Sequence, residues 1–252
     1  MKFSKKITAF FISIALLFFV FIPNANAATF VQSEVSDLST TVSLTGVGAG
    51  NLIVMWIKWE GATTGGVTVS DGTSSLSMGT LVEHSNNDLQ GQFAYLLSAN
   101  SGNKTYTVTF PSGSAYQRIR IAEYSYSGTI SLDVQNTGSG TGVTPTSGDI
   151  TTTGTDEIVL GGYGEYTGTT PSAPLINGVA ATFITGGTNA KMWYRLPTST
   201  FSNGNASLTI NISSNWIANV IAFKVTPSSA SKSKTTILGS KVFINGAKVY
   251  SN

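Results

Sequence analysis

Short segments in which polar and apolar residues alternate dominate this chain. Residues 105–110 (TYTVTF) and 207–212 (SLTINI) alternate at every position, which is typical of strands with one buried face. Residues 51–59 (NLIVMWIKW) are mostly apolar, which predicts a central strand covered on both faces. Gly, Ser and Asn clusters interrupt such runs about every 8–12 residues. After residue 27 no segment shows the helical period, so the pattern predicts an all-β fold.

Four of these segments recur in the same order at a spacing of about 100 residues. The matched pairs are 51–60 with 157–166, 92–97 with 191–196, 106–110 with 207–211, and 115–122 with 215–222. Such constant spacing predicts two sequence-related halves, over about 29–128 and 129–226.

The two halves can be arranged in two ways. They could form tandem sandwiches, or they could interleave into one sandwich with pseudo-two-fold symmetry. Residues 123–128 run into 130–134 through a short turn and without a long linker, which favours one compact unit. We therefore predict a two-sheet antiparallel β-sandwich of jelly-roll or concanavalin-like type over residues 28–226.

The first 27 residues have the features of a secretory signal peptide. Lys2, Lys5 and Lys6 precede the apolar run 7–22, and residues 25–27 (ANA) offer a cleavage site before Ala28. A retained membrane helix is the alternative, but the apolar run is short for a bilayer span. We expect a secreted, extracellular protein whose mature chain does not insert into a membrane.

The C-terminal segment differs from the rest. Residues 227–236 are polar and predict a linker, and residues 237–252 predict a β-hairpin around Asn245 and Gly246, a pair that favours a tight hairpin turn. An isolated hairpin is only marginally stable. We therefore expect it to dock on the body or to mediate self-association.

Composition narrows the classes of partner. Charged residues make up 10% of the chain, against roughly 25% in ordinary soluble domains. Once the three leader lysines are removed, 11 basic and 12 acidic residues remain, and residues 28–227 hold 7 basic against 12 acidic residues. This balance argues against nucleic-acid binding, which needs a clustered basic face. The chain has no cysteine, so an apolar core must stabilise it without disulfides.

Several phrases resemble a family of exported bacterial β-sandwich modules of unknown activity. They are residues 50–54 (GNLIV), 122–125 (AEYS), 132–134 (LDV) and 214–224 (SNWIANVIAFK). The resemblance covers about residues 29–225. It implies a non-catalytic part of a surface or secreted protein, in which the two halves occur together.

The chain lacks the residue patterns that most catalytic and cofactor-binding sites need. His84 is the only histidine, and we expect it to be exposed in a loop. The glycine clusters at 46–50 and 138–142 lead into non-helical segments, so they offer no phosphate-binding helix terminus. No segment has the closely spaced acids of a calcium loop, although backbone carbonyls could still form a calcium site. We predict no catalytic residue, metal or cofactor.

Glu123 alternates with Ile119 and Ile121, so it is expected to face the core. A buried carboxylate is costly unless it is paired or hydrogen-bonded. It could be a general acid with a raised pKa. We favour a structural acceptor at the join between the two halves.

A candidate ligand site combines aromatic and acidic residues at the ends of two related strands. Its members are Trp59, Glu60, Tyr163, Glu165 and Tyr166, and Gly161, Gly162 and Gly164 would let a ligand approach the backbone. Aromatic rings and carboxylates together favour sugar binding. The alternative is that Trp59 and Tyr163 merely cover the core.

Three functions follow from these features. The first is a non-enzymatic secreted or cell-surface binding or adhesion module, with carbohydrate or another surface component as its partner. The second is a structural subunit of a surface fibre that assembles through the C-terminal hairpin. The third is a glycoside hydrolase that uses Glu60 and Glu165 as its carboxyl pair.

Overall fold

The computed structural model describes residues 27–61, 65–84, 88–184 and 189–228, together with the backbone of three short strands near the C-terminus. These residues form antiparallel strands and no helix, which confirms the all-β prediction. In this part of the chain no helix is long and apolar enough to span a membrane. The signal-peptide prediction, most of the predicted linker, and the turn at Asn245 and Gly246 lie outside the described residues.

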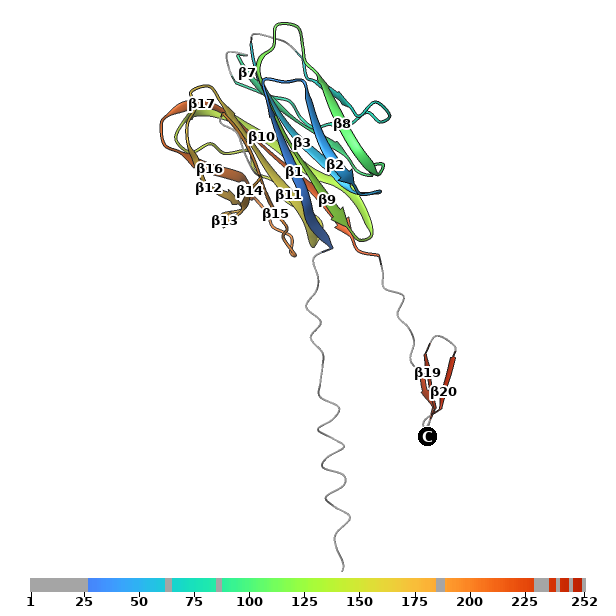
Figure 1. The fold of residues 1–252 in the computed structure, drawn as a ribbon. Coiled ribbons are helices and arrows are strands. Elements are labelled where there is room, and N and C mark those ends of the chain that lie inside the picture. The colour runs from blue at the N-terminus through green and yellow to red at the C-terminus, as the bar shows by residue number, and fades with distance from the viewer. Residues whose placement is uncertain are drawn as a thin grey trace, which may run out of the picture.

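Two large sheets form the middle of the molecule (Figure 1). Sheet A contains, in spatial order, β1 (Ala28–Asp37), β9 (Ala115–Tyr126), β3 (Leu52–Glu60), β7 (Leu89–Leu96) and β5 (Ser77–Met78), with β6 (Val82–Glu83) also paired to β7. Sheet C contains, in spatial order, β10 (Thr129–Gly142), β17 (Ser214–Thr226), β11 (Asp156–Glu165), β15 (Ala190–Arg195) and β14 (Thr182–Ile184).

Two smaller sheets cover the outer faces of this pair. Sheet B, against sheet A, contains β2 (Thr41–Val47), β8 (Gly102–Thr109) and β4 (Thr68–Ser70). Sheet D, against sheet C, contains β13 (Val179–Ala180), β12 (Pro171–Ile176) and β16 (Ala206–Ile210). The body therefore has four sheets, where the sequence led us to expect two.

The second pair of sheets follows from strands that are apolar on both faces. Val54 and Trp56 of β3 point into the cluster between sheets A and C, whereas Ile53, Met55 and Ile57 point into the cluster between sheets A and B. Because a strand exposes alternate residues to opposite faces, a strand that is apolar throughout needs a sheet on each side.

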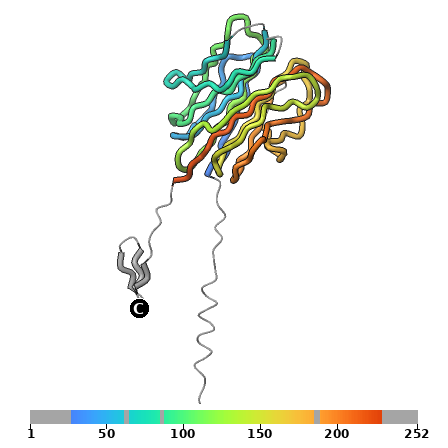
Figure 2. Tube along the Cα trace, turned by 180° about the vertical axis from the view of Figure 1, so that it is seen from behind, coloured from blue at the N-terminus to red at the C-terminus, as the bar shows by residue number. Residues whose placement is uncertain are grey.

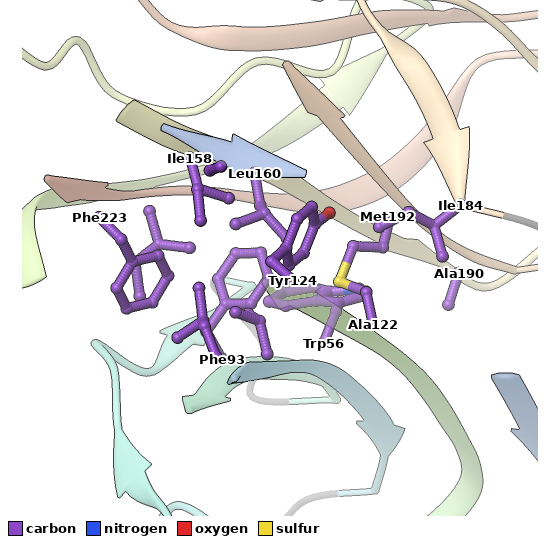
Figure 3. Close-up of a cluster of buried hydrophobic side chains, with 14 of the residues drawn as sticks. Trp56, Phe93, Ala122, Tyr124, Ile158, Leu160, Ile184, Ala190, Met192 and Phe223 are labelled. Atoms are coloured by element: carbon purple, nitrogen blue, oxygen red, sulfur yellow. The ribbon is translucent and has the colours of Figure 1, made fainter. Parts of the chain in front are cut away.

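The central cluster joins sheets A and C (Figure 3). Sheet A contributes Trp56, Phe93 and Tyr124, and sheet C contributes Met192 and Phe223. Residues 28–128 and 129–226 lie side by side in the two views, as the blue-to-green and yellow-to-red parts of the trace (Figure 2). The shared cluster makes them one packed body.

The strand directions define two ends of this body. β1 begins and β17 ends at one end, here called the proximal end (Figure 1). At the opposite, distal end, β1 stops at Asp37, β3 at Glu60 and β11 at Glu165. The described chain therefore enters and leaves the body at the proximal end.

Three short strands follow the body: β18 (Thr236–Leu238), β19 (Lys241–Ile244) and β20 (Ala247–Tyr250). β19 pairs antiparallel with both neighbours, and Ile244 lies opposite Ala247. The two strands of the expected hairpin are thus joined by a third.

Candidate functional site

Two of the five predicted ligand-binding residues are core residues. Trp59 has no exposed surface; it lies between sheets A and B, with its ring 6.0 Å from that of Phe110. Tyr163 is equally buried between sheets C and D, and its hydroxyl lies 2.9 Å from that of Thr169. The two rings are on opposite sides of the molecule, and neither presents a face to a ligand.

The three glycines of β11 make room for this chain's own side chains rather than for a ligand. A Cβ at Gly162 would lie 2.5 Å from Trp56 Cδ2. One at Gly164 would lie 2.7 Å from Lys58 Cγ, and one at Gly161 would overlap the Trp193 ring. The expected space is therefore occupied by two tryptophans and a lysine.

Glu165 is completely buried and organises the turn that follows β11. Its carboxylate accepts the backbone N–H groups of Thr167, Gly168 (3.0 Å) and Thr169 (3.1 Å). The hydroxyl groups of Thr167 (3.0 Å) and Ser214 (3.4 Å) also donate to it. With this many donors, the carboxylate satisfies the backbone of a buried turn and has no open side for a substrate.

The other two predicted residues, Glu60 and Tyr166, meet around Lys58 at the distal end. The Lys58 ammonium is buried, forms an ion pair with Glu60, and lies 6.0 Å from the centre of the Tyr166 ring. Burial lowers the pKa of Lys58, and the Glu60 carboxylate opposes that change. Burial, with Asp88 and Glu60 nearby, raises the pKa of Tyr166 to about 12.

Lys58 is the member of this cluster that the sequence analysis missed. It is the one charged residue within the apolar run 52–59, and it shares a strand face with Trp56 and Glu60. A lysine in such a strand needs a buried counter-charge, and Glu60 two residues later on the same face supplies it.

The arrangement of Glu60 and Glu165 does not favour glycoside hydrolysis. That reaction needs one carboxyl group to donate a proton and a second, open one to attack or activate water. The Glu165 carboxylate accepts hydrogen bonds from the backbone of the turn, and the Glu60 carboxylate forms an ion pair with Lys58. The Glu165 carboxylate is enclosed by its donors, and the Glu60 carboxylate, whose side chain is 13% exposed, is held by a buried ammonium group.

Near the distal end, Arg120 of β9 forms an ion pair with Asp37 of β1 within sheet A and also bonds to sheet C. Arg120 is fully buried, and its Nη1 lies 2.6 Å from Asp37 Oδ1. Its Nε donates to the carbonyl of Ala190 on sheet C, at 3.2 Å. Burial lowers the pKa of Arg120, and the bond to Asp37 opposes that change. Arg120 therefore fixes the two sheets to each other.

Glu123 is buried on the face of sheet A that meets sheet B. Its carboxylate accepts bonds from Gln32 Nε2 (2.5 Å), Gly48 N (2.7 Å) and Asn51 Nδ2 (2.6 Å). These contacts suit a structural acceptor. All three donors belong to the first half of the chain, so Glu123 anchors the turn before β3 and not the expected join between the halves.

His84 is buried, with 7% of its surface exposed, where we expected an exposed loop residue. Its backbone N–H donates to the carbonyl of Leu89, at 2.9 Å. This bond continues the pairing of β6 with β7 by one residue, so His84 adjoins the sheet instead of lying in a free loop. Within the described part of the chain, no three His, Cys, Asp or Glu side chains gather where they could hold a metal ion.

The outer side of sheet B carries a hollow that the sequence analysis did not predict. Its volume is about 260 Å³. The hydroxyl-bearing residues that line it are Thr68, Ser70, Ser75, Thr107 and Thr109. The alternation of residues 105–110 places all three of its threonines on one face, but it does not show which strands lie beside them.

No family model, curated protein or solved structure matches the chain. The resemblance to exported bacterial modules therefore stays an interpretation of the quoted phrases.

Proposed function

We propose that this protein is a secreted, non-enzymatic binding or adhesion module whose ligand is a neutral carbohydrate. The observation that carries the proposal is the outer face of sheet B. Its outward residues over 41–43, 68–70 and 105–109 are all Ser or Thr: Thr41, Ser43, Thr68, Ser70, Thr105, Thr107 and Thr109. Each hydroxyl both donates and accepts hydrogen bonds, as a sugar hydroxyl does, and this set includes no charge.

The positions of the carboxylates support a non-enzymatic role. Glu60, Glu123 and Glu165 are engaged by donors of the fold itself. The course of the chain supports display of the distal end, because the described body begins and ends at the opposite, proximal end (Figure 1).

A glycan array tests this proposal. Purified protein comprising residues 28–252 is expected to bind one or more neutral glycans, and to bind them without cleaving them. Absence of binding to every neutral glycan, or release of shorter sugars from a bound one, would contradict it.

We also infer that the two halves are copies of one unit. Sheet A has the order β1-β9-β3-β7, and sheet C has the order β10-β17-β11-β15. The strands that match in sequence, β3 with β11, β7 with β15 and β9 with β17, hold matching places in these orders. Each copy keeps its own strands, which supports two sandwiches packed through their larger sheets.

A second candidate function is a structural subunit of a surface assembly. β18 and β20 each pair with β19 alone among the described strands, so both have an edge that could accept a strand from a neighbour. Light scattering compares the full chain with a chain that ends at residue 228. A monomer in both cases would contradict this candidate.

A further inference from the structure

The hollow on sheet B is built by strand pairing. Ser70 lies opposite Thr107 on one side and Ser75 on the other, and Thr68 lies opposite Thr109. Paired residues project to the same face of a sheet. The intervening Val69 and Val108 point into the core beneath. Five hydroxyl-bearing residues therefore line one hollow with a volume of about 260 Å³.

Most of these hydroxyls are available to a ligand. Thr68, Ser75, Thr107 and Thr109 make no side-chain hydrogen bond within the described part of the chain, whereas Ser70 Oγ accepts the N–H of Gly72 at 3.0 Å. In contrast, Thr105, farther along the same face, lies 2.9 Å from Ser43 Oγ. The hollow thus gathers unused donors and acceptors.

No charged residue lines the hollow. The nearest acid on this hairpin, Asp71, is held by the N–H groups of Thr73 and Ser74, and it faces Lys104 at 3.6 Å. An anionic ligand would find no cation in the hollow, and a metal ion would find no carboxylate. Leu76 and Met78 add apolar surface at its side, as the carbon framework of a sugar requires.

From this geometry we propose that the hollow formed by β4, β8 and residues 75–78 is the subsite that holds a neutral sugar. This inference rests on the proposed function and assigns its site. The volume is slightly below that of ordinary ligand pockets, roughly 300–1,000 Å³. The hollow therefore suits one or two sugar residues, recognised through hydroxyl groups and without ring stacking.

The test removes one hydroxyl while keeping the shape of the side chain. Thr107→Val is compared with Thr209→Val, which changes an exposed threonine of β16 on sheet D. Both variants replace threonine by a residue that favours strands, so both are expected to fold. Thermal unfolding of each variant checks that expectation.

Calorimetric titration uses neutral trisaccharides (maltotriose, cellotriose and triacetylchitotriose) and any glycan found on the array. Thr107→Val is expected to weaken binding about tenfold, the usual effect of losing one hydrogen bond to a ligand. Thr209→Val is expected to bind like the unmodified protein. Equal affinities of the two variants would overturn the assignment of the site while leaving the proposed function standing. An unmodified protein that binds no neutral glycan would overturn both.

Discussion

Trp56 shows how single residues set the packing between the two central sheets. Its ring faces Gly162 of sheet C and also faces Gly91 of β7, where a Cβ would overlap it. Its indole N–H donates to the carbonyl of Tyr163 at 2.9 Å. A large aromatic side chain is thus accommodated by the absence of side chains opposite it, and its one polar group is satisfied.

Gly162→Ala is expected to lower the free energy of unfolding by about 1–3 kcal/mol, because the new Cβ would press on the Trp56 ring. Urea unfolding measures this. In the double variant with Trp56→Phe, the smaller ring should recover part of the loss. If the two changes in unfolding free energy were strictly additive, Gly162 and Trp56 would not be coupled, and the packing explanation for the glycine would be wrong.

Glu157 predicts a pH dependence of stability. It is 1% exposed; one oxygen accepts the N–H of Gly154 at 2.8 Å, and the other has no hydrogen-bond partner within the described chain. Burial, together with Asp133 beside it, raises the pKa of Glu157 to about 8, against the opposing effects of the Gly154 hydrogen bond and Lys224.

Since the folded pKa lies above the ordinary value of 4.5, the folded state binds more protons than the unfolded state between these values. Stability from this group is fully present below pH 4.5 and is lost as pH rises to about 8. Melting temperatures recorded from pH 4.5 to 9 should therefore fall less in Glu157→Gln than in the unmodified protein. If the melting temperatures of the two proteins changed with pH in parallel, the raised pKa of the buried Glu157 would be contradicted.

At the scale of elements, a buried carboxylate shapes the turn after β11. Glu165→Gln replaces an acceptor of several N–H groups by an amide that brings its own donors into the same space. A loss of about 1.5–3 kcal/mol in the free energy of unfolding is expected, as for hydrogen bonds to charged groups. The control is Glu34→Gln at an exposed position of β1, where little change is expected. Equal effects of both changes would contradict the structural role.

Strand alternation allowed the elements to be predicted but not their partners. The period of residues 105–110 identifies which side chains of β8 are buried, and the structure agrees. In β3 both faces are apolar, so the sequence could not show that Trp59 faces sheet B while Trp56 faces sheet C. The two apolar faces do imply a covering layer on each side of β3, which the expected two-sheet sandwich did not provide.

The candidate site was harder to predict than the strands. Glycine, aromatic and acidic residues together are compatible with a ligand site, but they serve packing equally well. In β11 the structure uses them for packing, because Trp56, Trp193 and Lys58 need the room. The hollow on sheet B depends on which strands become neighbours, and local alternation does not contain that information.

At the scale of the whole molecule, the cluster between sheets A and C couples the two halves. Arg120 adds a buried polar link between the same sheets. The body from residue 28 to residue 226 is therefore expected to unfold in one cooperative transition, with equal calorimetric and van't Hoff enthalpies. Two resolved transitions in differential scanning calorimetry would show that the halves unfold independently.

Amide chemical shifts show directly whether a neutral carbohydrate binds to the outer face of sheet B. Uniformly ¹⁵N-labelled protein is titrated with a neutral glycan that it binds on an array. We expect the shift changes to concentrate in β4, β8 and residues 74–78, with Thr68 and Thr107 among the most affected. Changes centred instead on Glu60 and Tyr166 at the distal end, or no changes at all, would contradict it.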